Sequence, residues 1–219
     1  MIRVVIADDH PLVRDGMKYL LSDCNDIELS AEVDNGNSLL EMIRSREFDV
    51  VLMDMIMPGR NGIELLKLIK HEFPKIPVLV LSTHKEDIYA VRAIKAGASG
   101  YLCKDYAGSS LVDAIRKVAA GGRYITPVVA ELMATEINST RQEALPHTLL
   151  SDREYQVFML TLSGKGSMEV ANELNLSIKT VTTHKARIKS KLKLSSATEM
   201  LTYAINNGLF PKQGGENQA

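Results

Sequence analysis

The chain has 219 residues, and its 26 basic and 27 acidic side chains give a formal net charge of −1, which by itself does not indicate a nucleic-acid partner. This length is enough for one large domain or two small ones. No apolar run approaches the ~18–20 residues that a membrane-spanning helix requires, and residues 1–4 are typical of a strand and not of a signal peptide, so we expect a cytoplasmic protein without a membrane partner.

Residues 1–122 alternate short β-rich runs with segments of helical periodicity. Strands are predicted at residues 2–7, 28–33, 50–53, 78–81 and 100–102. Helices are predicted at residues 12–21, 38–46, 62–71, 88–96 and 110–120. Five alternating strand–helix units predict an α/β doubly wound fold, with a five-stranded parallel sheet and right-handed crossovers.

The remainder of the chain is predicted to be helical. A short helix is predicted at residues 127–137, and the polar residues that follow read as a linker. Ser151 and Glu154 form a capping box that opens a helix ending near residue 162. Further helices are predicted at residues 167–174, 178–191 and 196–207. We therefore expect a first domain at residues 1–122, a linker with a short helix at 123–148, a small all-α domain at 149–210 and a flexible tail at 211–219.

The charges are distributed unevenly along the chain. Residues 1–122 carry 15 basic and 18 acidic side chains, a net charge of −3, and residues 149–210 carry 8 and 5, a net charge of +3. This asymmetry favours an acidic module joined to one that meets a polyanion, with a solvated basic face as the alternative. Cys24 and Cys103 lack the spacing of metal ligands and are expected to be reduced thiols.

Polar side chains stand where four of the predicted strands end. Asp8 and Asp9 follow the first strand and Asp54 follows the third, so all three carboxylates should meet at the carboxyl edge of the sheet, where such folds bind ligands. A cluster of three acids needs a counter-ion, and Mg²⁺ suits carboxylates together with phosphate oxygens. Ser82 and Lys104 follow the fourth and fifth strands and supply the hydroxyl and the ammonium that a phosphoryl group on Asp54 requires. Either one alone is better read as a loop residue, but the five together favour a site.

These residues carry a family resemblance. Asp8-Asp9, Asp54 in the pattern Asp-x-x-Met-Pro-x-x-x-Gly, Ser82 and Lys104 resemble the CheY-like receiver domain of bacterial two-component response regulators, which has a flavodoxin-like fold. The resemblance implies that Asp54 is the phosphoacceptor. It implies that Asp9, Asp54 and the backbone carbonyl of Ile56 bind Mg²⁺ directly, and that Asp8 acts through a metal-bound water.

The resemblance also implies a switch. Ser82 is then the switch hydroxyl, Lys104 pairs with the phosphoryl group, and Tyr101 is the aromatic side chain that follows Ser82 inward, although a core aromatic is an equal reading of Tyr101. Two positions depart from the family pattern. Asp105 stands where many receivers have Pro, and Thr83 stands where Ala or Gly is frequent, so that its larger side chain is expected to slow the access of phosphodonors or water.

A second resemblance lies in the basic part of the chain. Residues 150–154 (LSDRE), 169–184 (EVANELNLSIKTVTTH) and 188–192 (IKSKL) resemble the LuxR-type helix-turn-helix, and the combination with a receiver resembles the NarL/FixJ class. The residue pattern agrees, because a helix at 169–174, a short turn and a helix capped by Ser177 make helix-turn-helix geometry. Gly166 replaces the Ser or Thr that is usual at the start of the first of these helices, so Ser167 is expected to cap it one residue late.

The second of these helices predicts a DNA-reading face. At ~100° per residue, Val181, His184, Ile188 and Leu192 fall on one side and should pack inward, with His184 hydrogen-bonded and not a metal ligand. The opposite side should enter the major groove and carries Lys179, Thr182, Thr183, Ala186, Arg187 and Ser190. Lys185, Lys189 and Lys191 lie on the flanks, within reach of phosphates. Thr methyl groups and Ala suit thymine methyls, and Arg187 suits guanine.

The combined interpretation is a DNA-binding transcriptional regulator that a partner histidine kinase switches by phosphorylating Asp54. It has no catalytic residues, and it binds DNA as a homodimer with two recognition helices in successive major grooves. The outer face of the last helix is the expected dimer contact. Two alternatives remain: a Mg²⁺-dependent phosphatase or phosphotransferase with Asp54 as nucleophile, for which no insertion supplies a substrate pocket, and a binder that does not depend on phosphorylation.

Overall fold

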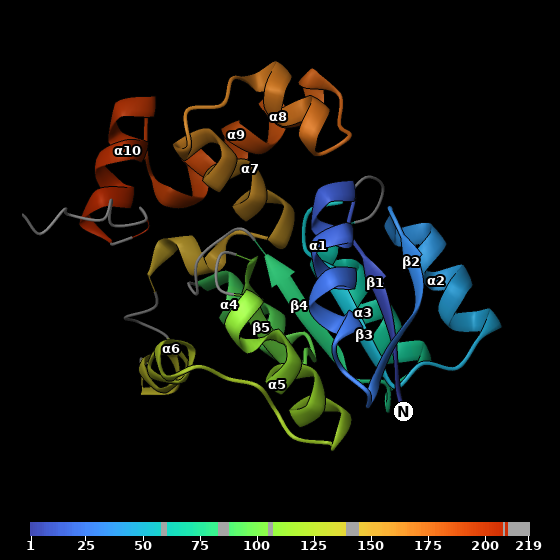
Figure 1. Ribbon diagram of the computed structural model, residues 1–219. Helices are drawn as coiled ribbons and strands as arrows, with labels where there is room; N and C mark the ends of the chain where they lie inside the picture. The colour runs from blue at the N-terminus through green and yellow to red at the C-terminus, as the bar shows by residue number, and fades with distance from the viewer. Residues whose placement is uncertain (58–60, 83–87, 105–106, 139–144, 208, 210–219) are drawn as a thin grey trace, which may run out of the picture. The chain divides into compact units, whose positions relative to one another are not determined.

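Figure 1 shows the computed structural model of the chain, which describes residues 1–57, 61–82, 88–104, 107–138, 145–207 and 209. Thr83, Asp105, residues 139–144 of the predicted linker and the predicted tail at 211–219 lie outside these residues. The chain divides into two compact units, Met1–Thr140 and Arg141–Ala219. In the part of the chain that the structure describes, no helix has the length and apolar character to cross a membrane.

The first unit is built on a five-stranded parallel sheet. Its strands are β1 (Ile2–Ala7), β2 (Ile27–Val33), β3 (Val50–Asp54), β4 (Val78–Ser82) and β5 (Gly100–Cys103). Their spatial order is β2-β1-β3-β4-β5, so the predicted α/β doubly wound fold is confirmed. From β1 the chain adds β2 on one side and then returns to add β3 on the other, so the order of strand addition reverses between β1 and β3. Folds of this class form their ligand-binding crevice at such a point.

Helices cover both faces of this sheet (Figure 1). They are α1 (Pro11–Ser22), α2 (Gly36–Ser45), α3 (Gly62–Glu72), α4 (Ile88–Lys95) and α5 (Ala107–Ala119). Helices α1 and α5 contact each other, as do α2 with α3 and α3 with α4. On the face under α1 and α5, Ile6, Leu52 and Leu81 of the strands pack with Leu21 and Ile115 of the helices. Strands β3 and β4 are buried along their whole length, which is typical of central strands in a parallel sheet.

The start of α3 fixes the loop that follows β3. Asn61 caps the helix by accepting hydrogen bonds from the backbone N–H groups of Ile63 and Glu64. A Cβ atom on Gly62 would lie 2.8 Å from Met55 Cα and closer still to the Met55 carbonyl oxygen. Only glycine therefore lets α3 approach the backbone directly after Asp54 this closely.

The helix predicted for the linker belongs to the first unit. This helix, α6 (Pro127–Asn138), contacts α4, and its Val129 is buried. Just before it, Tyr124 forms a parallel bridge with Gly100, and its N–H donates to the Ser99 carbonyl oxygen. The segment that leaves the fifth helix is thus attached to the edge strand β5 and to α4.

The second unit is helical, as predicted. It contains a 3-10 turn, η2 (Pro146–Leu149), and the helices α7 (Asp152–Leu162), α8 (Ser167–Glu173), α9 (Ile178–Leu192) and α10 (Ala197–Asn206). The predicted capping box at α7 is confirmed, with Ser151 and Glu154 hydrogen-bonded to each other's backbone N–H. The expectation that Ser167 caps α8 is wrong. Gly166 occupies the cap, and the Glu169 carboxylate accepts its N–H at 2.7 Å instead.

Candidate functional sites

The structure brings the three predicted acids together at the carboxyl edge of the sheet. Strands β1 and β3 are direct neighbours, with Ala7 opposite Met53, so the residues that follow them face the same crevice. Asp8 is fully buried, Asp54 is 4% exposed and Asp9 is half-buried. One ligand atom from each of Asp8, Asp9, His10 and Asp54 lies within 4.8 Å of the others. This spacing allows one cation to contact all of them.

Lys104 is the counter-ion of this cluster. Its Nζ lies 2.7 Å from Asp54 Oδ2 and 2.6 Å from Asp8 Oδ2, and its side chain is only 7% exposed. Burial opposes the charged ammonium, but Asp54 and Asp8 outweigh it and raise the pKa of Lys104. The ammonium thus lies where it can follow a new negative charge on Asp54.

The Asp54 carboxyl is held in a low-dielectric position. Burial raises its pKa to about 6, and the Lys104 ammonium and the Ile56 N–H, which donates to Asp54 Oδ1 at 3.2 Å, oppose this shift. A carboxylate that is ionised at neutral pH but poorly solvated is a competent nucleophile.

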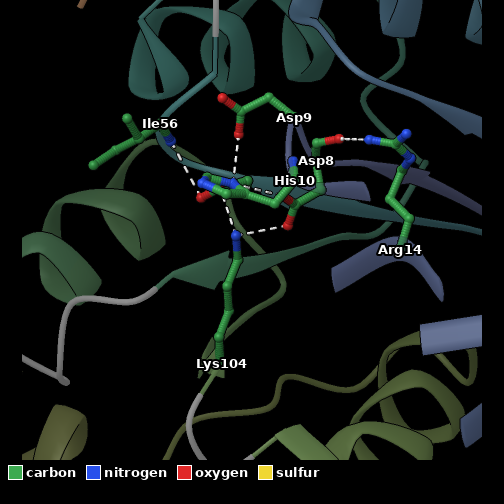
Figure 2. A network of polar contacts seen from close by, with 7 residues as sticks. Asp8, Asp9, His10, Arg14, Ile56 and Lys104 are labelled. Atoms are coloured by element: carbon green, nitrogen blue, oxygen red, sulfur yellow. Dashed lines mark hydrogen bonds and ion pairs between the residues drawn. The ribbon is translucent and has the colours of Figure 1, made fainter. Parts of the chain in front are cut away.

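The loop after β1 is fixed by two residues that the sequence argument did not single out (Figure 2). The His10 backbone N–H donates to Asp8 Oδ1 at 3.0 Å, and His10 Nδ1 lies 2.8 Å from Asp9 Oδ1. The Arg14 guanidinium donates to the Asp8 carbonyl oxygen at 2.6 Å and lies 3.5 Å from Glu32 Oε2. The signal in the sequence that could have pointed to these two residues is Pro11 at the start of α1. A proline there starts the helix directly after the acids, which places the first helical turn next to them.

The other predicted switch residues lie at the same edge or in the core. Ser82 is fully buried and pairs in register with Cys103, the residue before Lys104, so Ser82 and Lys104 lie at the carboxyl ends of neighbouring strands. Tyr101 is 1% exposed. Its burial agrees with a core aromatic and with an inward-turned switch aromatic alike.

The donor set fits a hard divalent cation. Asp8, Asp9 and Asp54 offer carboxylate oxygens, and the Ile56 backbone stands next to them. Asp9 Oδ1 and Asp8 Oδ2 are buried, and their polar neighbours among the described residues are His10 Nδ1 at 2.8 Å and Lys104 Nζ at 2.6 Å. Buried carboxylate oxygens of this kind are the ligands that Mg²⁺ takes. The residues present therefore match an acidic cation pocket.

In the second unit, α9 presents the predicted outer face. Val181, Ile188 and Leu192 are buried. The side chains exposed on the other side are those of Lys179, Thr182, Thr183, Ala186, Arg187 and Ser190. The Thr182 and Thr183 hydroxyls each donate to the carbonyl oxygen four residues earlier, at 2.9 Å. Their hydroxyl donors are thus engaged within the helix.

The basic side chains on the flanks of α9 differ in their contacts. Lys185 Nζ donates to Ser167 Oγ at 3.0 Å in a partly buried contact, and Lys189 Nζ donates to the Ser195 carbonyl oxygen at 3.3 Å in an exposed one. Lys191, predicted to reach phosphates, instead donates to Glu154 at 2.6 Å. This pairing does not follow from the sequence, because helical periodicity does not show which neighbouring helix a flank meets.

His184 departs from its prediction in one respect. It packs partly inward, and burial lowers its pKa. Its Nδ1, however, has no hydrogen-bond partner among the residues that the structure describes, so the expected hydrogen bond is wrong at that atom. The ring acts as a packed, neutral side chain.

Two family models match the chain. Residues 4–116 match the response regulator receiver domain, and residues 148–204 match the bacterial regulatory proteins of the luxR family. The response regulator GacA of Pseudomonas aeruginosa is 36% identical over 209 residues, which cover 95% of this chain and 98% of that protein. The response regulator UvrY of Escherichia coli is also 36% identical, over 95% of this chain and 96% of that protein.

Solved structures agree with both units. The response regulator RcsB of Salmonella typhimurium aligns with a TM-score of 0.70 and 26% identity, over 94% of this chain and 97% of that one. A structure of an RcsB–DNA complex aligns with a TM-score of 0.58 and 25% identity, over 93% of this chain and 98% of that one. The likeness thus extends over both units.

Proposed function

Because the chain belongs to the two-component response regulators, with a receiver domain followed by a LuxR-type DNA-binding domain, we propose that phosphorylation of Asp54 by a partner sensor histidine kinase controls its binding to DNA. The family consists of DNA-binding transcriptional regulators and not of enzymes, which removes the phosphatase alternative. The observation that carries the proposal is the Lys104 ammonium, which contacts both Asp54 and Asp8 in a buried acidic pocket.

Asp54 is proposed as the nucleophile. One of its carboxylate oxygens attacks the phosphorus of the phosphodonor, a bond from phosphorus to that oxygen forms, and the bond from phosphorus to the donor's nitrogen or oxygen breaks with its electron pair. A Mg²⁺ ion held by Asp9, Asp54 and the Ile56 carbonyl, with Asp8 acting through water, would supply charge neutralisation. Lys104 and Ser82 then bind the phosphoryl oxygens from the ends of β5 and β4.

The new charge is proposed to repack one side of the receiver. Ser82 ends β4 and Lys104 directly follows β5, so drawing them toward Asp54 displaces both strand ends, with Tyr101 following on β5. Helix α6 contacts α4, which follows β4, and Tyr124 forms a bridge with β5. The segment that leads out of the receiver therefore contacts elements next to both displaced strand ends. This segment is a physical route for the signal along the chain.

The DNA-binding unit is proposed to read duplex DNA through the exposed face of α9. Base contacts are assigned to Lys179, Thr182, Thr183, Ala186 and Arg187, and phosphate contacts to Lys185 and Lys189. A homodimer would present two such helices, and the exposed Leu201 and Ile205 of α10 are its proposed contact. RcsB provides a parallel, because one of its structures holds dimers bound to DNA. Since the DNA lies in the bacterial cytoplasm, the regulator is proposed to act there.

Labelling with acetyl phosphate tests the phosphoacceptor. We expect Asp54→Ala to abolish Mg²⁺-dependent labelling. Asp49→Ala, which removes a partly exposed carboxylate at the opposite end of the same strand, should leave labelling intact. Thermal unfolding of both variants checks that they fold. Undiminished labelling of folded Asp54→Ala protein would refute the assignment.

A further inference from the structure

The imidazole of His10 lies against the acids of the pocket and, among the residues that the structure describes, makes polar contacts with those acids alone. His10 Nδ1 is 2.8 Å from Asp9 Oδ1 and 3.3 Å from Asp8 Oδ1. His10 stands at the N-terminal cap of α1, but its side chain makes no capping hydrogen bond, and Pro11 sets the first turn. The contact with Asp8 that shapes the loop comes from the His10 backbone N–H. The ring is therefore dispensable for the start of the helix.

The spacing of these atoms is that of neighbouring metal ligands. Two donors at right angles around an ion, each about 2.1 Å from it, are about 3.0 Å apart. The two distances from His10 Nδ1 to the carboxylate oxygens lie on either side of this value. The ring is already within 4.8 Å of the Asp54 donor atom as well. Only a small adjustment would turn this contact into a shared coordination sphere.

We propose that His10 is an additional ligand of the receiver's cation pocket, so that the pocket takes borderline divalent ions such as Co²⁺, Ni²⁺ and Zn²⁺ through one nitrogen and several oxygens. The proposal rests on the proposed function, because it uses the same carboxylates. Mg²⁺ prefers oxygen ligands alone, whereas imidazole suits the later transition metals. Binding through Nδ1 requires that the ring carry its proton on Nε2.

The competing reading is that the ring only donates a hydrogen bond to Asp9 and leaves when any cation arrives. His10 is 64% exposed, so nothing in the described residues prevents it from turning outward. The two readings differ in selectivity. An all-oxygen pocket already favours later transition metals to some degree, so the rank order of ions decides nothing. What decides between the two readings is how much of the preference for Co²⁺ and Zn²⁺ over Mg²⁺ is lost when His10 is replaced.

The experiment measures Mg²⁺, Co²⁺ and Zn²⁺ binding to the full-length chain by calorimetry, and follows Co²⁺ also by its d–d absorption band. The wild type is compared with His10→Asn, and with His71→Asn as a control for an exposed histidine on α3. Excess Mg²⁺ competes with Co²⁺ and identifies the Co²⁺ ion that occupies the acidic pocket.

We expect His10→Asn to weaken pocket binding of Co²⁺ and Zn²⁺ at least roughly tenfold, to shift the Co²⁺ band and to leave Mg²⁺ binding within about twofold. His71→Asn should change none of these. Equal effects on all three ions, or no effect on any, would overturn the proposal while leaving the Mg²⁺ pocket in place. Failure of the wild type to bind Mg²⁺ or Co²⁺ in competition would instead overturn the cation site of the proposed function together with this inference.

Discussion

The Lys191 ammonium lies 2.6 Å from the Glu154 carboxylate and ties the last turn of α9 to the first turn of α7. Glu154 is almost fully buried and also accepts the Ser151 N–H. Burial alone would raise the pKa of Glu154, but the hydrogen bonds from Lys191 and Ser151 lower it. A lysine on α9 is therefore part of the framework of its domain.

Replacing Lys191 should destabilise the DNA-binding unit. Lys191→Ala leaves the buried Glu154 carboxylate without its cation, which should cost about 1–3 kcal/mol. Lys179→Ala removes an exposed lysine from the same helix and should change stability by less than about 0.5 kcal/mol while weakening DNA binding. Hydrogen exchange of α7 and α9 in the full chain measures the stability of the DNA-binding unit in both variants. Equal protection in the two variants would show that the ion pair contributes nothing.

Gly62 and Gly16 should respond to alanine in opposite directions. Gly62→Ala forces a Cβ onto the Met55 backbone and should destabilise the receiver by about 1–3 kcal/mol. It should also weaken Mg²⁺ binding, because Met55 lies between Asp54 and Ile56. At Gly16, on helix α1, a Cβ meets no described atom within 4 Å, so Gly16→Ala should stabilise the receiver by about 0.5–1 kcal/mol. Thermal unfolding measures the stability of both variants. An unchanged stability of Gly62→Ala would contradict the close approach of Gly62 to the Met55 backbone.

Thr182 should contribute its methyl group, and not its hydroxyl, to DNA binding. The hydroxyl already donates to the Ile178 carbonyl oxygen at 2.9 Å. Thr182→Val keeps the methyl and should retain affinity within about threefold, whereas Thr182→Ser removes it and should lose about 1 kcal/mol at a thymine contact. Titrations with a DNA fragment selected in vitro measure both variants. The opposite order would mean that the hydroxyl leaves Ile178 and contacts DNA.

The buried Asp54 carboxyl should lower the stability of the metal-free receiver as pH rises. Burial raises its pKa from 3.8 to about 6. Between these values the folded chain binds more protons than the unfolded chain. The contribution of Asp54 to the free energy of unfolding therefore falls as pH increases from about 4 to about 6. Asp54→Asn removes the effect. In EDTA, the free energy of unfolding of this variant should exceed that of the wild type by little near pH 4 and by at most about 3 kcal/mol above pH 6.

Thermal unfolding of wild type and Asp54→Asn across this pH range measures that gain. In the variant the Lys104 ammonium loses one of its two carboxylate partners, which keeps the gain in stability below this limit. A gain that does not change between pH 4 and pH 7 would contradict the raised pKa.

Much of the receiver followed from local chemistry. Apolar runs that end in acids are sufficient to place Asp8, Asp9 and Asp54 at one edge, because parallel strands share their carboxyl ends. The contacts of His10 and Arg14 were not predictable in this way. They depend on how the turn between β1 and α1 folds back over the acids, and sequence spacing does not give that geometry.

In the second unit, periodicity separated the inner and outer faces of α9 correctly at Val181 and Ile188. It did not give the partner of Lys191, which comes from another helix. The expected Ser167 cap was wrong for a different reason, because the Glu169 side chain accepts the Gly166 N–H. Side chains that bridge elements depend on tertiary distances, which a single helical period cannot supply.

The most direct test of the account is the affinity of the full-length protein for a DNA fragment selected in vitro, measured with and without acetyl phosphate. We expect phosphorylation to tighten binding of the wild type by roughly 5- to 150-fold, the usual range of coupling between two sites. Asp54→Ala should bind with the same affinity under both conditions. If phosphorylated wild type and Asp54→Ala bound this DNA equally well, the protein would be a binder that does not depend on phosphorylation, and the switch proposed at Asp54 would be contradicted.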